Sequence, residues 1–256
     1  IVFGDWSSDV CSSDLYDHPH AIIENHSIKH LCLSFCNLTE IPPTVSKLKA
    51  LISLLLDNNQ IRTLPPNFNE LQNLQLLSLE SNPLSEWPQV LEDLPRLRSL
   101  NLNETKIQNF PDHIHGCANL EEIHLMGLGL DHIPEWIVQL PRLATLDMES
   151  NYIAEIPPKI FRNPKQLKKL NFAFNKLTSV PVEVVFTKCE INIEENPISN
   201  FRNRQEMDWL RTPKGRNEAR KRHMNFPAHI ADRIRTNTPL EDRKSTRLNS
   251  SHRIRY

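Results

Sequence analysis

A repeat of 23 residues constrains the fold of this chain more than any other feature. Residues 51–73 have the sequence LISLLLDNNQIRTLPPNFNELQN, in which leucines precede an asparagine, Asn59. The same order of residue types starts again, each time 23 residues further along, at Leu74, Leu97, Leu120 and Leu143. Self-similarity at a fixed period of this length predicts a solenoid, in which each unit packs against its neighbours.

Each repeat contains the signals for one strand and one turn. The alternating leucines around L-x-L predict a short strand with one buried and one exposed face. A single strand cannot bury its leucine face alone, so the strands of successive repeats are expected to stack. The asparagine follows the strand, where its amide can satisfy backbone groups of the turn. The proline that follows the second apolar cluster ends strand pairing and sends the chain around the outer face.

The motif L-x-x-L-x-L-x-x-N-x-L, followed by I/L-P-x-x-I/L-x-x-L, resembles the leucine-rich repeat family. The resemblance covers residues 28–201, as seven repeats and a partial one. It implies an α/β repeat solenoid, a horseshoe with a parallel concave sheet and short irregular or 3-10 convex segments. We expect single helical turns there, with longer ones at Pro134–Leu140 and Pro158–Phe161. The Ile-Pro form and the lack of cysteine caps look like the short intracellular subgroup, similar to Ras-pathway scaffold and suppressor proteins.

The asparagine position is not filled uniformly. Cys36 occupies it in the first repeat, and Thr105 and Leu128 occupy it in the fourth and fifth. A ladder of asparagine side chains is therefore expected to be interrupted in the middle of the solenoid.

The segments outside the repeats differ in composition and origin. Residues 16–27 are expected to be a lead-in or N-terminal cap, and residues 202–241 a capping helix and a basic tail. At the two ends, residues 5–15 (DWSSDVCSSDL) and 242–252 (DRKSTRLNSSH) can be encoded by opposite strands of one short DNA sequence. That DNA resembles a sequencing-library adapter, so we interpret residues 1–15 and 242–256 as translated adapter and exclude them from fold reasoning.

Charge and cysteine content suggest a compartment and a kind of partner. Residues 16–201 contain 15 Lys and Arg against 22 Asp and Glu, whereas residues 202–235 contain ten against four. An acidic body therefore precedes a basic tail. Five cysteines without clustered caps favour a reducing, cytoplasmic setting, with nuclear import through the basic tail as a further possibility. No apolar run is long enough for a membrane span.

The exposed strand positions of the concave side form the expected binding surface, where acidic residues recur between a few apolar ones. We predict partner contacts from Leu55, Asp57, Leu76, Glu80, Asn103, Glu104, Glu122, His124, Met126, Asp147, Glu149 and Glu194. Like charges on neighbouring strands are mildly unfavourable, so their recurrence indicates a protein partner with a basic surface. Ordinary solubility is the competing interpretation, since polar residues must occupy these positions in any case.

Other residue clusters carry weaker signals. Phe35 and Phe174 fall at strand ends, where packing under a cap or loop is favoured over a role as partner anchors. His113, His115 and Cys117 are metal-ligand types, but no second ligand pair occurs at a suitable spacing. The chain has no phosphate-cradling glycine loop, nucleophile elbow or H-E-x-x-H motif, so we expect no enzyme activity, small-molecule substrate, cofactor or metal site.

The sequence thus predicts a protein–protein interaction module, an adaptor or scaffold in intracellular signalling. Three alternatives remain open. The chain could be an extracellular recognition domain, or the recognition arm of a larger signalling enzyme, truncated at both ends. It could also bind nucleic acid or an acidic membrane through its basic tail, although few aromatic residues there could stack on bases.

Overall fold

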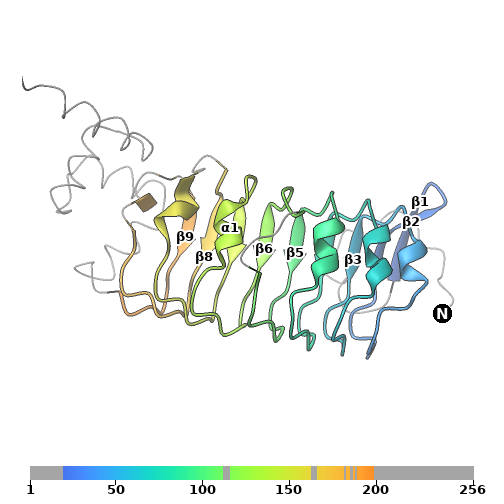
Figure 1. Ribbon diagram of the computed structural model, residues 1–256, viewed down its shortest axis with the longest axis horizontal. Helices are drawn as coiled ribbons and strands as arrows, with labels where there is room; N and C mark the ends of the chain where they lie inside the picture. Colours follow the sequence, from blue (N-terminus) through green and yellow to red (C-terminus); the bar gives the residue numbers. More distant parts are fainter. Residues whose placement is uncertain are drawn as a thin grey trace, which may run out of the picture.

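The computed structural model describes residues 20–111, 116–162, 166–181, 183–184, 187 and 189–198. They form one sheet of nine strands, which follow each other in sequence order (Figure 1). The strands are β1 (His20–Glu24), β2 (Ser27–Cys32), β3 (Ser53–Leu55), β4 (Leu76–Ser78), β5 (Ser99–Asn101), β6 (Glu122–His124), β7 (Thr145–Asp147), β8 (Lys169–Asn171) and β9 (Glu190–Asn192). The expectations for the adapter ends, for the capping helix and basic tail, and for His113 and His115 lie outside the described residues.

The strands pair in the order that the repeats predict. Strands β2 to β9 are parallel, whereas β1 runs antiparallel to β2. A two-residue turn with positive φ at Asn25 and His26 joins β1 to β2, which is the geometry that tight hairpins favour. β1 therefore covers the first edge of the parallel sheet, an edge that would otherwise expose unpaired backbone groups.

The register places equivalent residues of successive repeats side by side. Leu54 pairs with Leu77, and Leu77 pairs with Leu100. This central, inward-facing position is buried in every strand from β3 to β9, at Leu54, Leu77, Leu100, Ile123, Leu146, Leu170 and Ile191. Burying each such side chain contributes about 1.5–3 kcal/mol relative to leaving it in water. The stacked strands thus share one continuous core.

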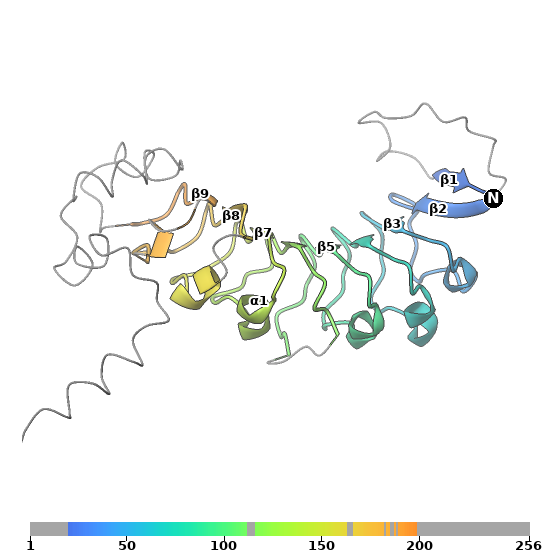
Figure 2. The same cartoon turned by 90° about the horizontal axis from the view of Figure 1, so that it is seen from above.

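The convex side consists of short helical turns, as expected. They are η2 (Val45–Lys47), η3 (Pro66–Glu70), η4 (Gln89–Asp93), α1 (Glu135–Gln139) and η5 (Pro158–Arg162). The expectation of longer turns at the last two places is wrong, since α1 and η5 have five residues each, as η3 and η4 do. Figure 2 shows these turns on the outer side of the curve and the strands along the inner side. Pro65, Pro88 and Pro134 occupy the N-cap positions of η3, η4 and α1. Their fixed φ and missing N–H redirect the chain out of the sheet at these points.

An asparagine ladder connects the repeats inside the turns. The side-chain amide of Asn82 donates to the carbonyl oxygen of Leu56 in the preceding repeat, at 2.9 Å, and its Oδ1 accepts from the N–H of Ile61. Asn59, Asn151, Asn175 and Asn196 make the same kind of bond to the preceding repeat. The ladder breaks where expected. The hydroxyl of Thr105 reaches only Leu102 in its own repeat, and Leu128 carries no polar side-chain group.

A left-handed backbone residue precedes each asparagine position. Its φ lies between 52° and 72° in all eight repeats, at Phe35, Asn58, Ser81, Glu104, Gly127, Ser150, Phe174 and Glu195. This conformation costs a residue with a Cβ about 1–2 kcal/mol. Except at Asn58 and Gly127, whose residue types adopt this conformation readily, the turn that follows each strand therefore depends on stacking between repeats.

The convex face also holds an aromatic cluster that links the third, fourth and fifth repeats. The ring centroid of Trp87 lies 5.8 Å from that of Phe110 and 5.2 Å from that of Trp136. Tilted aromatic pairs at such distances add about 0.5–1.5 kcal/mol to the burial of their surfaces. The cluster spans the repeats in which the asparagine ladder is broken, and so strengthens the solenoid there.

Candidate functional site on the concave face

The strand register sorts the predicted contact residues into columns on the exposed side of the sheet. Leu76 and Glu122 begin their strands, whereas Leu55, His124 and Asp147 end theirs. Another column follows two residues after each strand, with Asp57, Glu80, Asn103, Met126, Glu149 and Glu194. Glu104 belongs to the left-handed positions next to it. We call the carboxylates of these columns, Asp57, Glu80, Glu104, Glu122, Asp147, Glu149 and Glu194, the concave acidic face.

Several carboxylates of the concave acidic face are held by the next repeat. An oxygen of Glu80 accepts a hydrogen bond from the side-chain amide of Asn101 at 2.8 Å, and an oxygen of Glu149 accepts one from Asn171 at 2.7 Å. Both asparagines end a strand of the following repeat, and both also accept from a backbone N–H two residues later. These bonds form a second polar ladder. Sequence analysis missed it, although an acidic residue followed 21 or 22 residues later by an asparagine is its visible signal.

Asp57 takes part in the same ladder through a serine. Its Oδ1 accepts a hydrogen bond from the hydroxyl of Ser78 and one of 3.0 Å from the N–H of Glu80. Burial raises the pKa of the Asp57 carboxyl, and the two hydrogen bonds offset this only in part. The ionised form of Asp57 therefore destabilises the folded state relative to the protonated form.

His124 and Asp147 lie opposite each other on neighbouring strands. Nδ1 of His124 is 3.9 Å from an oxygen of Asp147. Burial works to raise the pKa of Asp147, but His124, the N–H of Glu149 and the charge of Lys169 together lower it. Asp147 therefore stays ionised, and the acidic charge at the middle of the sheet is maintained.

The remaining predicted residues differ in how far they reach the surface. Asn103 is buried, and its Oδ1 accepts from the N–H of Met126 at 2.8 Å, so its side chain supports the backbone. Leu55 and Leu76 are half-buried on adjacent strands, as is Met126 further along. Glu104, Glu122 and Glu194 are exposed. The structure thus combines fixed carboxylates, exposed carboxylates and partly exposed apolar side chains on one face.

The two phenylalanines at strand ends are more exposed than the sequence suggested. Phe35 is 59% exposed and Phe174 is 54% exposed. The expectation that they pack under a cap or loop is therefore wrong. Both occupy left-handed positions.

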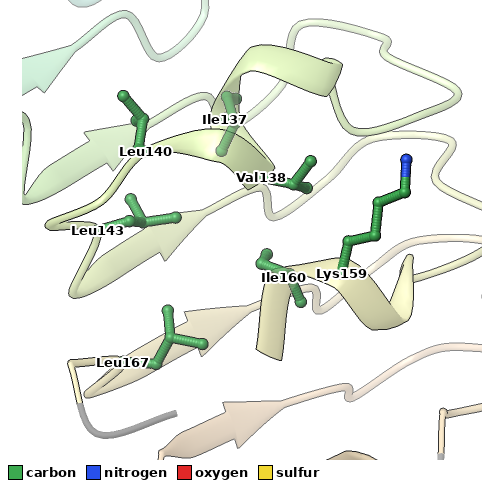
Figure 3. A pocket seen from close by; sticks show the side chains of 7 residues that line it. All are labelled: Ile137, Val138, Leu140, Leu143, Lys159, Ile160 and Leu167. Atoms are coloured by element: carbon green, nitrogen blue, oxygen red, sulfur yellow. The ribbon is translucent and has the colours of Figure 1, made fainter. Parts of the chain in front are cut away.

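On the convex side a small hollow lies between α1 and η5, but it does not offer a binding site comparable to the concave face. It has a volume of about 10 Å³, room for about one water molecule, and is lined mainly by apolar side chains such as Ile137 and Ile160. Figure 3 shows that the ammonium group of Lys159 points away from these side chains. It pairs instead with Glu135 at 2.9 Å. This hollow is a packing defect of the core rather than a ligand site.

Three other properties of the described residues bear on function: metal ligands, cysteine pairing and helices that could span a membrane. They contain no group of three or more His, Cys, Asp or Glu side chains that could hold a metal ion. Of the cysteines in this part of the chain, Cys32, Cys36 and Cys117 are free thiols. Among the helices described, none has both the length and the apolar character needed to cross a membrane.

Comparison with known proteins shows what the repeats are similar to. Residues 26–84 and 141–186 match the leucine-rich repeat model. No curated protein matches the chain. A leucine-rich-repeat protein of Leptospira interrogans is 30% identical, with a TM-score of 0.52 over 67% of this chain and 56% of that one.

Other solved structures share the fold. Internalin C2 of Listeria monocytogenes is 23% identical, with a TM-score of 0.59 over 68% of this chain and 75% of that one. The plant peptide hormone receptor RGFR1, solved with RGF2, is 26% identical, with a TM-score of 0.52 over 62% of this chain and 27% of that one. The chain thus spans little more than half of the Leptospira protein and about a quarter of the receptor. Together with the ladder of parallel strands, these matches show that the described part of the chain has the leucine-rich-repeat fold.

Proposed function

We propose that this chain is a non-enzymatic adaptor or scaffold, and that its concave acidic face binds a protein partner with a basic surface. The observation that carries this proposal is the hydrogen bonding of Glu80 and Glu149 to the following repeat. Side chains that are fixed before binding lose little conformational entropy when a partner arrives. A row of fixed carboxylates is therefore suited to recognise lysine or arginine side chains.

The apolar side chains of the same face support a protein rather than a small ion as the partner. Leu55 and Leu76 lie on adjacent strands and are only half-buried, as is Met126. Protein interfaces combine an apolar centre with a polar rim. On this face the carboxylates of Glu104 and Glu122 would belong to the rim, where they affect the association rate and partner choice.

Free cysteines suit the cytoplasm, which we propose as the compartment of this adaptor, in a signalling role. The thiols of Cys32, Cys36 and Cys117 are free, which is usual where glutathione keeps cysteines reduced. The leucine-rich-repeat fold generally serves protein interaction, and no catalytic family matches the chain.

The test compares two charge-reversed variants of the full chain in affinity capture from a cell lysate. Glu104→Lys with Glu122→Lys changes two exposed carboxylates of the concave acidic face, each of which accepts only an exposed serine hydroxyl bond from the preceding repeat. Asp131→Lys with Glu155→Lys makes the same change in net charge at exposed positions elsewhere and serves as the control. Circular dichroism first establishes that both variants fold. We expect a protein retained by the parent and the control to be lost by the concave variant. Equal capture by all three forms would reject the concave acidic face as the binding site.

A further inference from the structure

A second surface of the solenoid has the opposite charge. At the edge where strands β2 to β4 begin, the chain forms a hollow of about 320 Å³. Its lining includes the cationic side chains of Lys29, Lys49 and Arg96, the amide side chains of Asn73 and Gln75, and the apolar side chain of Ile52. We call this the edge hollow. Its residues come from three successive repeats, so only the stacked solenoid brings them together.

The cations of the edge hollow are not balanced by an equal number of carboxylates. Lys49 forms an ion pair with Glu70. Within the described part of the chain, Lys29 makes no ion pair or side-chain hydrogen bond, and the one side-chain hydrogen bond of Arg96 goes to the uncharged Asn73. Three positive charges therefore face one negative charge. The excess of about two charges matches the charge of a phosphomonoester near neutral pH, about −1.5 to −2, better than that of a single carboxylate.

Hydrogen bonds hold the polar lining in place. The side-chain amide of Asn73 donates to the backbone carbonyl of Lys49 at 2.8 Å. Its Oδ1 accepts from Nη1 of Arg96 at 2.6 Å. This bond holds one nitrogen of the guanidinium and leaves its other N–H donors for a ligand, since a guanidinium carries five. The amide of Gln75 and the ammonium of Lys29 supply further donors on the neighbouring strands.

We propose that the edge hollow binds a phosphate group carried by a side chain of a protein partner. Guanidinium and ammonium groups are the side chains that most often bind phosphate, Arg through paired N–H donors and Lys as a point charge. The volume of the hollow admits one phosphorylated side chain with its nearest neighbours. An acidic membrane would instead fit a flat basic surface, whereas here the cations surround a depression with an apolar side chain among its lining residues. The site is independent of the concave acidic face, which attracts groups of the opposite charge.

The test is a titration of the ¹⁵N-labelled full chain with the pentapeptide Ala-Gly-phosphoserine-Gly-Ala, followed by amide chemical shifts at constant ionic strength. The unphosphorylated peptide and the peptide with glutamate in place of phosphoserine are the comparison ligands. Lys29→Gln with Arg96→Gln removes two cations of the edge hollow. Lys47→Gln with Arg62→Gln removes two exposed cations that do not line it, and is the matched control. Sedimentation with phosphatidylcholine vesicles that contain a phosphoinositide tests the membrane.

We expect saturable shifts at the amides of Lys29, Ile52 and Gln75 with the phosphopeptide, and weaker binding of both comparison peptides. The hollow variant should bind at least about tenfold more weakly than the control, because a hydrogen bond to a charged group is worth about that factor. Shifts that do not saturate, or that change equally in the two variants, would overturn the proposal. Binding to vesicles without binding to the phosphopeptide would also overturn it, and would assign the site to a lipid headgroup. None of these results depends on whether the concave acidic face binds its partner.

Discussion

Asn82 joins two repeats through hydrogen bonds at both ends of its amide. Its Nδ2 donates to the carbonyl oxygen of Leu56 at 2.9 Å, and its Oδ1 accepts from the N–H of Ile61 at 3.0 Å. Both partners belong to the preceding repeat, and Asn82 itself is buried. The side chain thus replaces the water that these backbone groups lose when the repeats stack.

Replacement of this asparagine should therefore destabilise the solenoid strongly. Asn82→Ala leaves the buried Ile61 N–H without its side-chain partner, and a buried unsatisfied group costs about 1–3 kcal/mol. It also removes one of the two amides that donate to the Leu56 carbonyl, which keeps only that of Asn59. We expect the free energy of unfolding, measured by urea denaturation, to fall by about 3 kcal/mol. Gln60→Ala removes an exposed amide nearby and should cost far less. Equal losses in the two variants would contradict a special role for the ladder.

The break in the ladder at Thr105 should be repairable. In the intact part, the asparagine amide reaches a carbonyl 26 residues earlier, as Asn82 reaches Leu56 and Asn151 reaches Leu125. At position 105 the equivalent carbonyl belongs to Leu79. Thr105→Asn should add this bond and raise the free energy of unfolding by about 1 kcal/mol, the usual net value of a hydrogen bond. A lower midpoint of thermal unfolding would show that the turn cannot accommodate the longer side chain.

Gly116 occupies a position where no side chain fits. A Cβ there would lie 1.5 Å from the carbonyl oxygen of Glu92, so Gly116→Ala must displace backbone. We expect a loss of about 3 kcal/mol or more in the free energy of unfolding, at or above the upper end of ordinary overpacking. Gly127→Ala is the control, since its Cβ would meet only the Cγ of Glu104 at 3.5 Å and its positive φ costs about 1 kcal/mol. Similar thermal unfolding of the two variants would be evidence against this close approach.

The repeat period was sufficient to predict the fold because it determines both strand pairing and burial. Once Leu54 and Leu77 are equivalent positions, their strands must stack in register for either to be buried. The interruption of the asparagine ladder at Thr105 could also be predicted from the sequence, because it depends only on which side chain occupies that position. The antiparallel strand β1 could not be predicted from the repeat pattern, because residues 16–27 lie outside the repeats. The close packing at Gly116 was also hidden, because it depends on the path of two convex segments.

The candidate site was predicted less fully than the fold. Strand alternation was enough to assign Glu80 and Glu149 to the concave side. Their bonds to Asn101 and Asn171 escaped notice because they join residues of different repeats, at neighbouring columns. The edge hollow was missed for the same reason, since its cations are far apart in the sequence.

The raised pKa of Asp57 predicts a pH-dependent stability of known sign. Burial is the main cause, so the folded-state pKa lies above the unfolded value of about 3.9. Protonation therefore favours folding, and this contribution is lost as the pH rises through the folded-state pKa. Asp57→Asn keeps an oxygen that can accept from Glu80 and removes the buried charge. We expect the variant to melt at a higher temperature than the parent at pH 7, with the difference shrinking towards pH 4. Lower stability of the variant at pH 7 would show that the Ser78 hydroxyl requires a carboxylate.

The pair of His124 and Asp147 should respond in the opposite direction. The folded-state pKa of Asp147 is lowered, so its ionised form contributes stability above the unfolded pKa of about 3.9 and loses it as the pH falls through the folded-state pKa. Since burial alone would raise this pKa, the lowering depends on His124, on the N–H of Glu149 and on Lys169. His124→Gln removes the first of these and should raise the pKa of Asp147, measured from the carboxyl ¹³C shift. His30→Gln is the control, because it removes a histidine from the same sheet at strand β2, far from Asp147. An unchanged pKa in both variants would leave the N–H of Glu149 and the charge of Lys169 as the groups that keep Asp147 ionised.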